Sequence, residues 1–546
     1  MNKTFKRVLC LVLSICAVLS LTACGGGGSR RPGPNKGGET KVEAVTFPLE
    51  EPMEFTFMIQ GVKSASFDEQ IANNALIKKL EKETNVHINW QFVGNDTTKL
   101  NLLMSSGDYG DVIFGGPILN SVTASKYIAA GKIQELTPYM TEELMPEFMA
   151  DLAENPDMMC MITASDGKAY CLPKITGLEG QYLESPIWIN KKWLDNLGLQ
   201  IPTTTDELIE VLKAFRDRDP NGNGLPDEIP YLACTDHAQG NLEPLAGIFG
   251  IATKDGVNDA FVQVVDGKVT FAPLNEGYKD YIKFMRTLYT ENLLWSEAFI
   301  ASTATYSAKL TSSTPLVGMF TLNNPLETDY VDDYVCILPP KAEGYEPCWY
   351  FHPAINGSKN QFYVTDKCEN VSVLMAYMDR FFNLENSLLC DFGALEEGRF
   401  VMQDGKYTVV EMDSVEATKL GREYPTFTNL TGNSIRSFTA KDYATVLNLS
   451  PDERVKQDCY ILYADIVNKE IWPRPYYAPE VCNEADLYVT DINLAVTQRR
   501  GSWITGRVDV DADWDKFISD LNRCGLQEYL VILQDAYDAY LAGNKQ

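Results

Sequence analysis

Oxygen-bearing side chains recur at alternate positions of one short loop, residues 219–228. Acid or amide side chains stand at loop positions 1, 3 and 5, a glycine at position 6, and acids at positions 9 and 10. Oxygens arranged in this way around a tight turn can converge on one hard cation, and about six to eight of them suit calcium. The predicted calcium ligands are the side chains of Asp219, Asn221, Asn223, Asp227 and Glu228 and the carbonyl oxygen of Leu225.

The loop departs in two ways from the helix–loop–helix calcium motif known as the EF-hand. Position 12 is Pro230, where that motif has a bidentate glutamate, so Asp227 or Glu228 must serve instead. Pro226 and Pro230 also oppose a regular exit helix. Calcium in this loop is therefore expected to stabilise the fold and not to act as a sensor that opens a groove. The alternative is an Asn-Gly turn that side-chain hydrogen bonds to the backbone stabilise without a metal.

The elements that position further candidate residues begin at Glu51, where strand-like and helix-like patterns alternate. Runs rich in β-forming residues cover 53–59, 87–93 and 111–114 with helical stretches between them, which predicts a parallel sheet covered by helices. Ligands of such sheets lie beyond the carboxyl ends of the strands, here near Gln60, Asn95, Gly115 and Gly116. Gln60 and the two glycines are candidate ligand contacts, although plain turn chemistry also explains the glycines.

Helices are predicted where apolar residues recur with helical periodicity. Thr204 and Glu207 form a capping box that opens a helix whose apolar face runs from Leu208 to Phe215. Two further amphipathic stripes, 514–521 and 526–537, lie near the carboxyl terminus. Their aromatic residues are expected in the core.

The amino terminus is typical of an exported chain. Basic residues at 3, 6 and 7 precede an apolar run over 8–21 that is too short to span a bilayer. The run Leu21–Cys24 resembles the bacterial lipobox, in which the cysteine is diacylated and becomes the first mature residue. We therefore predict a signal peptide over 1–23, a lipid anchor on Cys24 and a flexible Gly/Pro-rich tether over 24–48. Cleavage without lipidation is the alternative.

The bulk properties narrow the range of functions. A length of 546 residues suits two or three domains, and a net charge of −28 opposes nucleic acid as a partner. The ten cysteines from Cys160 to Cys524 include no CxxC pair, so zinc is not expected; they are either free buried thiols or disulfides. The three histidines accompany no nucleophile motif, and neither GxSxG, HExxH nor GxxxxGK[ST] occurs.

Several motifs together resemble one known family. The run Trp188–Leu199 leads into Pro202–Thr204, the capped helix and the 219–230 loop, and this block resembles the central signature of the family 1 extracellular solute-binding lipoproteins of bacterial ABC importers. Residues 107–114 resemble the family's first-lobe motif, and 166–173 resemble its hairpin before the crossing between lobes. The likeness is weakest from about 321 to 480.

The resemblance implies an α/β fold of the two-lobed periplasmic-binding-protein type, with hinge-crossing strands, a helical carboxyl-terminal region and a structural calcium. It places lobe 1 at 49–170 plus about 305–375, and lobe 2 at about 171–304 plus about 376–546. It further implies a sugar or oligosaccharide as solute, permease subunits as partners, and a monomer anchored at the outer face of the cell membrane. No catalytic residue is expected.

Aromatic rings are the expected platforms for a sugar, because its C–H faces stack on them. Candidates lie beside polar or loop-like residues, outside clear amphipathic stripes, and Trp188 follows the first crossing between lobes. The candidates are Trp188, Trp295, Trp349, Tyr350 and Trp472. The rival functions are an exported carbohydrate hydrolase, which would use paired carboxylates, and a glycan-binding surface lipoprotein.

Overall fold

The computed structural model describes the chain from residue 42 to residue 543, apart from short internal gaps. The gaps are 95–96, 116–118, 120, 155–157, 165, 176, 254–260, 326–327, 329, 353–356, 411, 413, 436–437, 474, 476 and 478–480. The predicted signal peptide, Cys24 and most of the tether lie outside the described residues. Residues 43–546 form one compact unit, to which every element below belongs.

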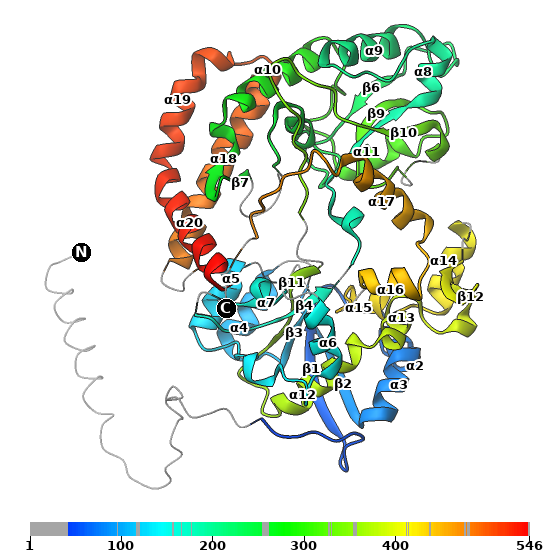
Figure 1. Ribbon diagram of the computed structural model, residues 1–546, viewed down its shortest axis with the longest axis vertical. Coiled ribbons are helices and arrows are strands. Elements are labelled where there is room, and N and C mark those ends of the chain that lie inside the picture. The colour runs from blue at the N-terminus through cyan, green and yellow to red at the C-terminus, as the bar shows by residue number, and fades with distance from the viewer. Residues whose placement is uncertain are drawn as a thin grey trace, which may run out of the picture. The chain divides into compact units, whose positions relative to one another are not determined.

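The first sheet has five strands in the order β2-β1-β3-β11-β4. Strands β1 (Met53–Ile59), β2 (Val86–Phe92) and β3 (Val112–Phe114) are parallel, and helices α3 (Ala75–Thr84) and α4 (Thr97–Ser106) connect them. This confirms the predicted βαβαβ order. Strand β11 (Gly357–Val364) pairs antiparallel with β3, and β4 (Leu172–Ile175) pairs antiparallel with β11. The three parallel strands therefore end at one common edge (Figure 1).

Aromatic side chains on one face of the first sheet hold it to segments far along the chain. Phe57 makes edge-to-face contacts with Trp90 of β2 and Phe114 of β3, with ring centroids 5.7 Å apart in both cases. Phe427, at the start of α15 (Phe427–Thr431), lies 5.9 Å from Trp90 and 6.1 Å from Phe114. This packing brings residues near 430 to the sheet's carboxyl edge.

The second sheet has four strands in the order β10-β5-β9-β6. These are β10 (Tyr334–Ile337), β5 (Ile187–Asn190), β9 (Val317–Thr321) and β6 (Ile229–Leu232). Strands β6 and β9 are parallel, while β5 is antiparallel to both of its neighbours. The capped helix α9 (Thr205–Asp217) packs on β6 through its apolar face, as its sequence pattern predicts.

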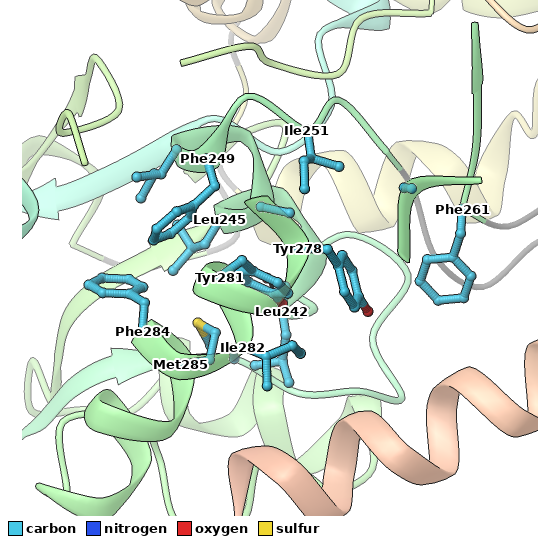
Figure 2. Close-up of a cluster of buried hydrophobic side chains, with 14 of the residues drawn as sticks. Leu242, Leu245, Phe249, Ile251, Phe261, Tyr278, Tyr281, Ile282, Phe284 and Met285 are labelled. Carbon is cyan, nitrogen blue, oxygen red and sulfur yellow. Dashed lines mark hydrogen bonds between the residues drawn. The ribbon is translucent and has the colours of Figure 1, made fainter. Parts of the chain in front are cut away.

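A large apolar core lies under the second sheet and the helices around it. Figure 2 shows part of it, where the 3-10 helix η4 (Glu243–Phe249) meets α10 (Glu276–Thr290). Phe249, Tyr281 and Phe284 interlock there, with Phe249 ring centroids 6.4 Å and 5.7 Å from the other two. Glu243 is buried beside this cluster and pairs with Arg500 at an Nη1–Oε2 distance of 2.5 Å. The core therefore encloses a charged pair.

Strand pairing divides the lobes differently from the division that the sequence suggested. Residues 305–375 were assigned to lobe 1, but β9 and β10 lie in this range and pair with β5 in the second sheet. Helices α12 (Val371–Asp379) and α13 (Leu384–Phe392) pack instead on α6 (Pro146–Glu154) and α3, which flank the first sheet, and α15 packs on α2 (Phe67–Asn73). The first lobe therefore extends past residue 376, because those helices bury their apolar faces against it.

Three long helices close the chain: α18 (Cys482–Ile504), α19 (Val510–Arg523) and α20 (Leu526–Gly543). The two predicted stripes fall on α19 and α20, and Phe517, Leu521 and Leu533 are fully buried, as expected. Among the described residues, no helix combines the length and the apolar run that crossing a bilayer would need.

Further helices and two hairpins complete the described chain. The hairpins are β7 (Val262–Val265) with β8 (Lys268–Phe271), and β12 (Phe400–Gln403) with β13 (Lys406–Val409). The further helices are α2 (Phe67–Asn73), α5 (Ser121–Ala129), α6 (Pro146–Glu154), α7 (Met158–Ile162), α8 (Lys191–Leu197), α11 (Thr303–Leu310), α14 (Ser414–Glu423), α16 (Ala440–Thr445) and α17 (Pro451–Tyr463).

The buried carboxylate of Asp379 makes the stability of the first lobe depend on pH. It accepts the backbone N–H groups of Phe148 at 2.9 Å and Glu147 at 3.4 Å. Burial raises the pKa of Asp379 to about 6, and the two hydrogen bonds offset this only in part. This pKa lies above the value of about 3.9 expected in the unfolded chain. At a pH between the two pKa values, the folded state therefore binds the proton more tightly than the unfolded state does.

We therefore expect the free energy of unfolding contributed by this group to rise as pH falls from about 6 to about 4, by on the order of 2 kcal/mol. Urea unfolding across this range, in the wild type and in Asp379→Asn, isolates the contribution because the variant cannot titrate there. Equal pH slopes in the two proteins would contradict the assignment.

Candidate functional site

The 219–228 loop joins the end of α9 to β6 and is held by its own side chains. Asp219 accepts the backbone N–H of Asn223 at Oδ1 (3.1 Å) and that of Gly224 at Oδ2 (3.0 Å). The Oδ1 of Asn223 accepts the N–H of Leu225 at 2.7 Å. Asp219, Gly222 and Gly224 all have positive φ, so the backbone winds tightly around one point.

The amide groups of the loop converge on one carboxylate. Asn223 donates through Nδ2 to both oxygens of Asp227 at 3.1 Å, and Asn221 donates to Oδ1 at 3.2 Å. A half-turn of either amide would present its oxygen in place of its nitrogen. Asp219, Asn221, Asn223 and Asp227 are therefore brought together as the sequence predicted.

Glu228 adds a buried carboxylate to this loop. Its Oε1 is buried without a hydrogen-bond partner. Burial raises the pKa of Glu228, and the nearby carboxylates of Asp227 and Asp219 raise it further, against the lowering effect of backbone hydrogen bonds. A bound cation would satisfy the orphaned oxygen and neutralise the repulsion, so the residues fit calcium. In the described part of the chain, no group of three His, Cys, Asp or Glu side chains by itself forms a metal cluster; this set would depend on the amide and carbonyl oxygens.

Glycines line the carboxyl edge of the first sheet. Gly61 and Gly94, just past β1 and β2, exchange two backbone hydrogen bonds of 2.8 and 3.0 Å. Gly115, just past β3, has φ of +119°, and a Cβ there would stand 2.3 Å from Oδ1 of Asn433. Gln60 is half-buried at the same edge. The predicted contact Gly116 lies outside the described residues.

Two polar residues that the sequence did not single out complete this edge. Asn433 is buried and donates through Nδ2 to the carbonyl oxygens of Thr431 (2.6 Å) and Phe114 (3.4 Å). The hydroxyl of Ser434 is buried and has no hydrogen-bond partner among the described residues. They stand more than three hundred positions along the chain from β3. The packing of Phe427 on the sheet and the bond from Asn433 to Phe114 hold this segment at the edge.

The second sheet presents a matching polar loop after β6. His237 accepts the backbone N–H groups of Gln239 (3.2 Å) and Gly240 (2.8 Å) at Nδ1, which places its proton on Nε2. Asn241, two residues before η4, accepts the N–H of Glu243 at 3.0 Å through its side-chain oxygen. Loop 235–241 thus lies at the carboxyl ends of the parallel strands β6 and β9. It was missed because its residues match no motif.

Three predicted aromatic platforms belong to the core instead. The indole N–H of Trp188 donates to the Leu322 carbonyl at 2.9 Å, and that of Trp349 to the Glu184 carbonyl at 2.7 Å. Trp349 also packs edge-to-face on Tyr463 at 5.3 Å. Trp295 is 7% exposed within the same core. Polar neighbours in sequence suggested exposure, but each ring is buried between two elements.

Tyr350 and Trp472 do lie together, beside a small cavity. The cavity also contacts Gln263, Asn468 and Glu470, and its volume is about 70 Å³. Pockets for small-molecule ligands occupy roughly 300 Å³ or more. Trp472 is itself almost fully buried, whereas Tyr350 is half-buried. This cavity is therefore too small to hold a sugar as it stands.

The geometry defines a class of protein. Two sheets each present glycine, amide and hydroxyl groups at the carboxyl ends of parallel strands, and the chain crosses between the sheets more than once. Such edges bind a ligand through hydrogen bonds and close backbone approach. These are the features of an α/β binding protein with two lobes.

Comparison with known proteins gives the family. A family model described as bacterial extracellular solute-binding protein matches residues 65–308. The fructooligosaccharide ABC transporter substrate-binding protein FusA of Streptococcus pneumoniae serotype 4 is 31% identical over 569 aligned positions, covering 99% of each chain. The polygalacturonan/rhamnogalacturonan-binding protein YtcQ of Bacillus subtilis is 27% identical over 41% of each chain. The chain belongs to the extracellular solute-binding proteins of bacterial ABC importers, and it is a carrier rather than an enzyme.

Solved structures agree on the fold. The complex of FusA from S. pneumoniae with kestose has a TM-score of 0.76 at 26% identity, covering 90% of this chain and 99% of that chain. A solute-binding protein from Bifidobacterium longum infantis that binds human milk oligosaccharides (HMO) has a TM-score of 0.77 at 24% identity, with the same coverage. The two-lobed α/β fold expected from the sequence is thereby confirmed.

Proposed function

We propose that the chain captures a short oligosaccharide outside the cell and passes it, chemically unaltered, to the membrane-spanning subunits of its importer. The observation that carries this proposal is the paired set of carboxyl edges, where backbone, amide and hydroxyl groups are grouped without a nucleophile motif. The similarity to FusA, a fructooligosaccharide ABC transporter substrate-binding protein, supports the solute class. A kestose-like fructooligosaccharide is therefore the first solute to test.

The contacts that we assign to the sugar lie on both sheets. Gln60 and Gly115 at the edge of the first sheet are joined by Asn433 and Ser434, and loop 235–241 faces the solute from the second. Gly116, outside the described residues, stays a candidate from the sequence alone. Tyr350 is retained as a candidate aromatic contact because it is half-buried at a crossing segment, where its carbonyl accepts the N–H of Glu184 at 3.0 Å. Trp472 is kept only as the neighbour that supports it.

Binding energy is sufficient to bias two lobes toward closure. Shifting a two-state equilibrium from mostly open to mostly closed requires about 5.5 kcal/mol of differential affinity. A micromolar ligand supplies about 8 kcal/mol in total. If most contacts with the sugar form only when both sheets touch it, binding of one sugar is enough to favour the closed form of the carrier. The closed form then distinguishes a loaded carrier from an empty one.

Isothermal titration calorimetry with a panel of sugars tests this assignment. We expect kestose or nystose to bind with a Kd on the order of micromolar and one site per chain. Glucose and fructose should bind far more weakly, because a monosaccharide reaches fewer of the groups on the two edges. A panel spanning fructans, human milk oligosaccharides and pectin fragments with no binder would oppose the sugar assignment.

We further propose that calcium stabilises the 219–228 loop. A solved structure of the FusA EF-hand mutant with fructo-nystose (TM-score 0.75, 25% identity, covering 90% of this chain and 99% of that chain) indicates that this relative has an EF-hand. In this chain the orphaned Oε1 of Glu228 and the mutual repulsion of its acids support a cation there. When bound, calcium would supply positive charge that attracts the acids of the loop, and it would so hold the end of α9 close to the start of β6.

Calcium at about 10 mM is expected to raise the free energy of unfolding by about 1–3 kcal/mol, given the Kd of about 10⁻⁴–10⁻³ M typical of exported sites. Thermal melting with calcium and with chelator measures this shift. Glu228→Gln should abolish most of the response, whereas Asp217→Asn, which alters an exposed acid just outside the loop, should keep it. A calcium response that is the same in both variants would exclude the loop as the site.

We also propose that Cys24 is diacylated and anchors the monomeric carrier at the outer face of the cell membrane. The support is that the family is extracellular and that Leu21–Cys24 resembles the lipobox. Mass spectrometry of the mature terminus tests this directly. A diacylated Cys24 is expected, and an unmodified mature terminus would remove the anchor.

A further inference from the structure

The loop over 235–241 closes on itself around one imidazole. The N–H of Cys234, just after β6, donates to the Gly240 carbonyl at 2.8 Å, and the N–H of His237 donates to the Cys234 carbonyl at 3.0 Å. From inside this ring of contacts, Nδ1 of His237 accepts the N–H groups of Gln239 at 3.2 Å and of Gly240 at 2.8 Å. The imidazole therefore holds the backbone of both residues.

A tyrosine of α11 supports the other side of the imidazole. Tyr306 is fully buried, and its ring centroid lies 4.4 Å from that of His237, which is itself buried. The phenol also lies against Gly240, where a Cβ would stand 2.4 Å from the hydroxyl oxygen. The imidazole thus lies between the loop backbone and α11, and this packing keeps Nδ1 aimed at the two N–H groups.

Further hydrogen bonds fix the loop on both sides of Gln239. Asp236 accepts the backbone N–H of Thr303 through Oδ2 and the Thr303 hydroxyl through its carbonyl, both at 2.9 Å. Asn241 donates through Nδ2 to the Ala238 carbonyl at 3.1 Å. The side chain of Gln239 is half-exposed in this rigid frame. Its amide can donate and accept hydrogen bonds at the same time, which suits neighbouring hydroxyl groups of a sugar.

We propose that Gln239 contacts the solute through its side-chain amide and that His237 is the residue that positions it. The inference rests on the proposed function and deepens it, because it names the group that the second sheet supplies to the sugar. The loop lies at the carboxyl ends of the parallel strands β6 and β9, where ligands of such sheets bind. His237 is buried and acts through the backbone of Gln239.

The role of His237 requires a neutral imidazole. A second proton would bind at Nδ1 and occupy the lone pair that accepts both N–H groups. The titratable groups beside the ring are the carboxylate of Asp236, the phenol of Tyr306 and the thiol of Cys234, whose pKa burial raises. At their ordinary pKa values, these three side-chain types keep their charge between about pH 5.5 and 7.5, whereas histidine titrates at about pH 6.5. Affinity for the solute should therefore be retained above about pH 6.5 and lost as the pH falls below it.

Calorimetry on the mature chain tests the two roles, with kestose or with the tightest-binding sugar of the panel. His237→Phe keeps a ring against Tyr306 but loses the acceptor, and Gln239→Ala loses the amide. Each should weaken binding about 10- to 100-fold at about pH 7.5. His237→Asn places an amide oxygen near the position of Nδ1, so its affinity should return to within about threefold of the wild type.

The pH profile of binding separates positioning from packing. Between about pH 7.5 and 5.5, the wild type should lose affinity about tenfold, as one histidine that must be neutral requires. His237→Asn cannot take up that proton and should lose most of this dependence. His87→Asn is the matched control, because His87 lies on β2 in an exposed pair with Glu81 and should keep the wild-type profile.

Amide hydrogen exchange of the peptide that contains 235–241 tests the positioning without any sugar. Exchange should be slow in the wild type and His237→Asn, and faster in His237→Phe. Unchanged exchange in His237→Phe, or equal pH profiles of binding in the wild type and His237→Asn, would overturn the role of His237. If His237→Phe does not fold, the pH profiles decide.

The same measurements separate this inference from the proposed function. Wild-type affinity in Gln239→Ala would overturn the contact alone, since the chain would still bind its sugar. A wild type that binds no sugar of the panel would refute the proposed function and the contact together. Hydrogen exchange would then still decide whether His237 holds the loop.

Discussion

Replacing Arg500 with methionine is expected to lower the free energy of unfolding by about 3–5 kcal/mol, because it leaves the Glu243 carboxylate buried without its counter-charge. Arg500 is 4% exposed and Glu243 is 1% exposed, so solvent cannot replace the missing partner. The hydroxyls of Tyr278, 3.3 Å from Glu243 Oε1, and Tyr281, 3.5 Å from Oε2, are neutral donors and do not compensate for a full charge. Urea unfolding of the calcium-loaded protein measures the loss.

Two further variants distinguish the buried pair from ordinary packing. In Glu243→Gln/Arg500→Met both charges are gone, so most of the lost stability should return. Lys191→Ala breaks an exposed pair with Asp195 and should change stability by less than about 0.5 kcal/mol. If the double variant is as unstable as Arg500→Met, the loss comes from the shape of the arginine and not from its charge.

Replacing Gly115 with alanine is expected to weaken sugar binding about 100-fold, equivalent to about 2.7 kcal/mol. The new Cβ would meet Asn433 Oδ1 at 2.3 Å, and the φ of +119° disfavours any side chain. Both effects displace the amide that we assign to the sugar. Calorimetry with the best sugar of the panel measures the change in Kd.

Gly107 supplies the matched control for this substitution. It also has a positive φ, +84°, and a Cβ there meets nothing within 4 Å. Gly107→Ala should therefore cost about 1 kcal/mol of stability through backbone strain and leave the sugar Kd unchanged. Equal sugar affinity in Gly115→Ala and wild type would remove the β3 edge from the binding site.

Local patterns in the sequence predict the elements that are built from neighbouring residues. The βαβαβ order of β1 to β3, the capped helix α9 and the stripes of α19 and α20 all depend on short-range periodicity, and all are confirmed. The side chains of the loop over 219–228 also meet through contacts that are separated by a few residues, while the calcium expected there stays a prediction. Glycine positions such as Gly115 can be inferred for the same reason.

Long-range pairing is what the sequence could not reveal. The residues of β9 and β10 do not indicate which sheet these strands join. The sequence therefore assigned them to lobe 1, whereas both pair with β5 in the second sheet. Asn433 reaches the edge of β3 through long-range contacts, among them the packing of Phe427 on that sheet and its own bond to Phe114. Trp349 has polar neighbours in sequence, yet it is buried against Tyr463 and the crossing segment. Burial of this kind depends on which distant elements meet.

The central claim is that this chain binds an oligosaccharide and releases it unaltered. The most direct measurement is to incubate the calcium-loaded protein with an equimolar amount of the sugar it binds best, denature the complex, and quantify the released sugar by chromatography and mass spectrometry. The account predicts complete recovery of intact oligosaccharide, with one molecule bound per chain before denaturation. Shortened or modified sugar that accumulates with time would contradict it.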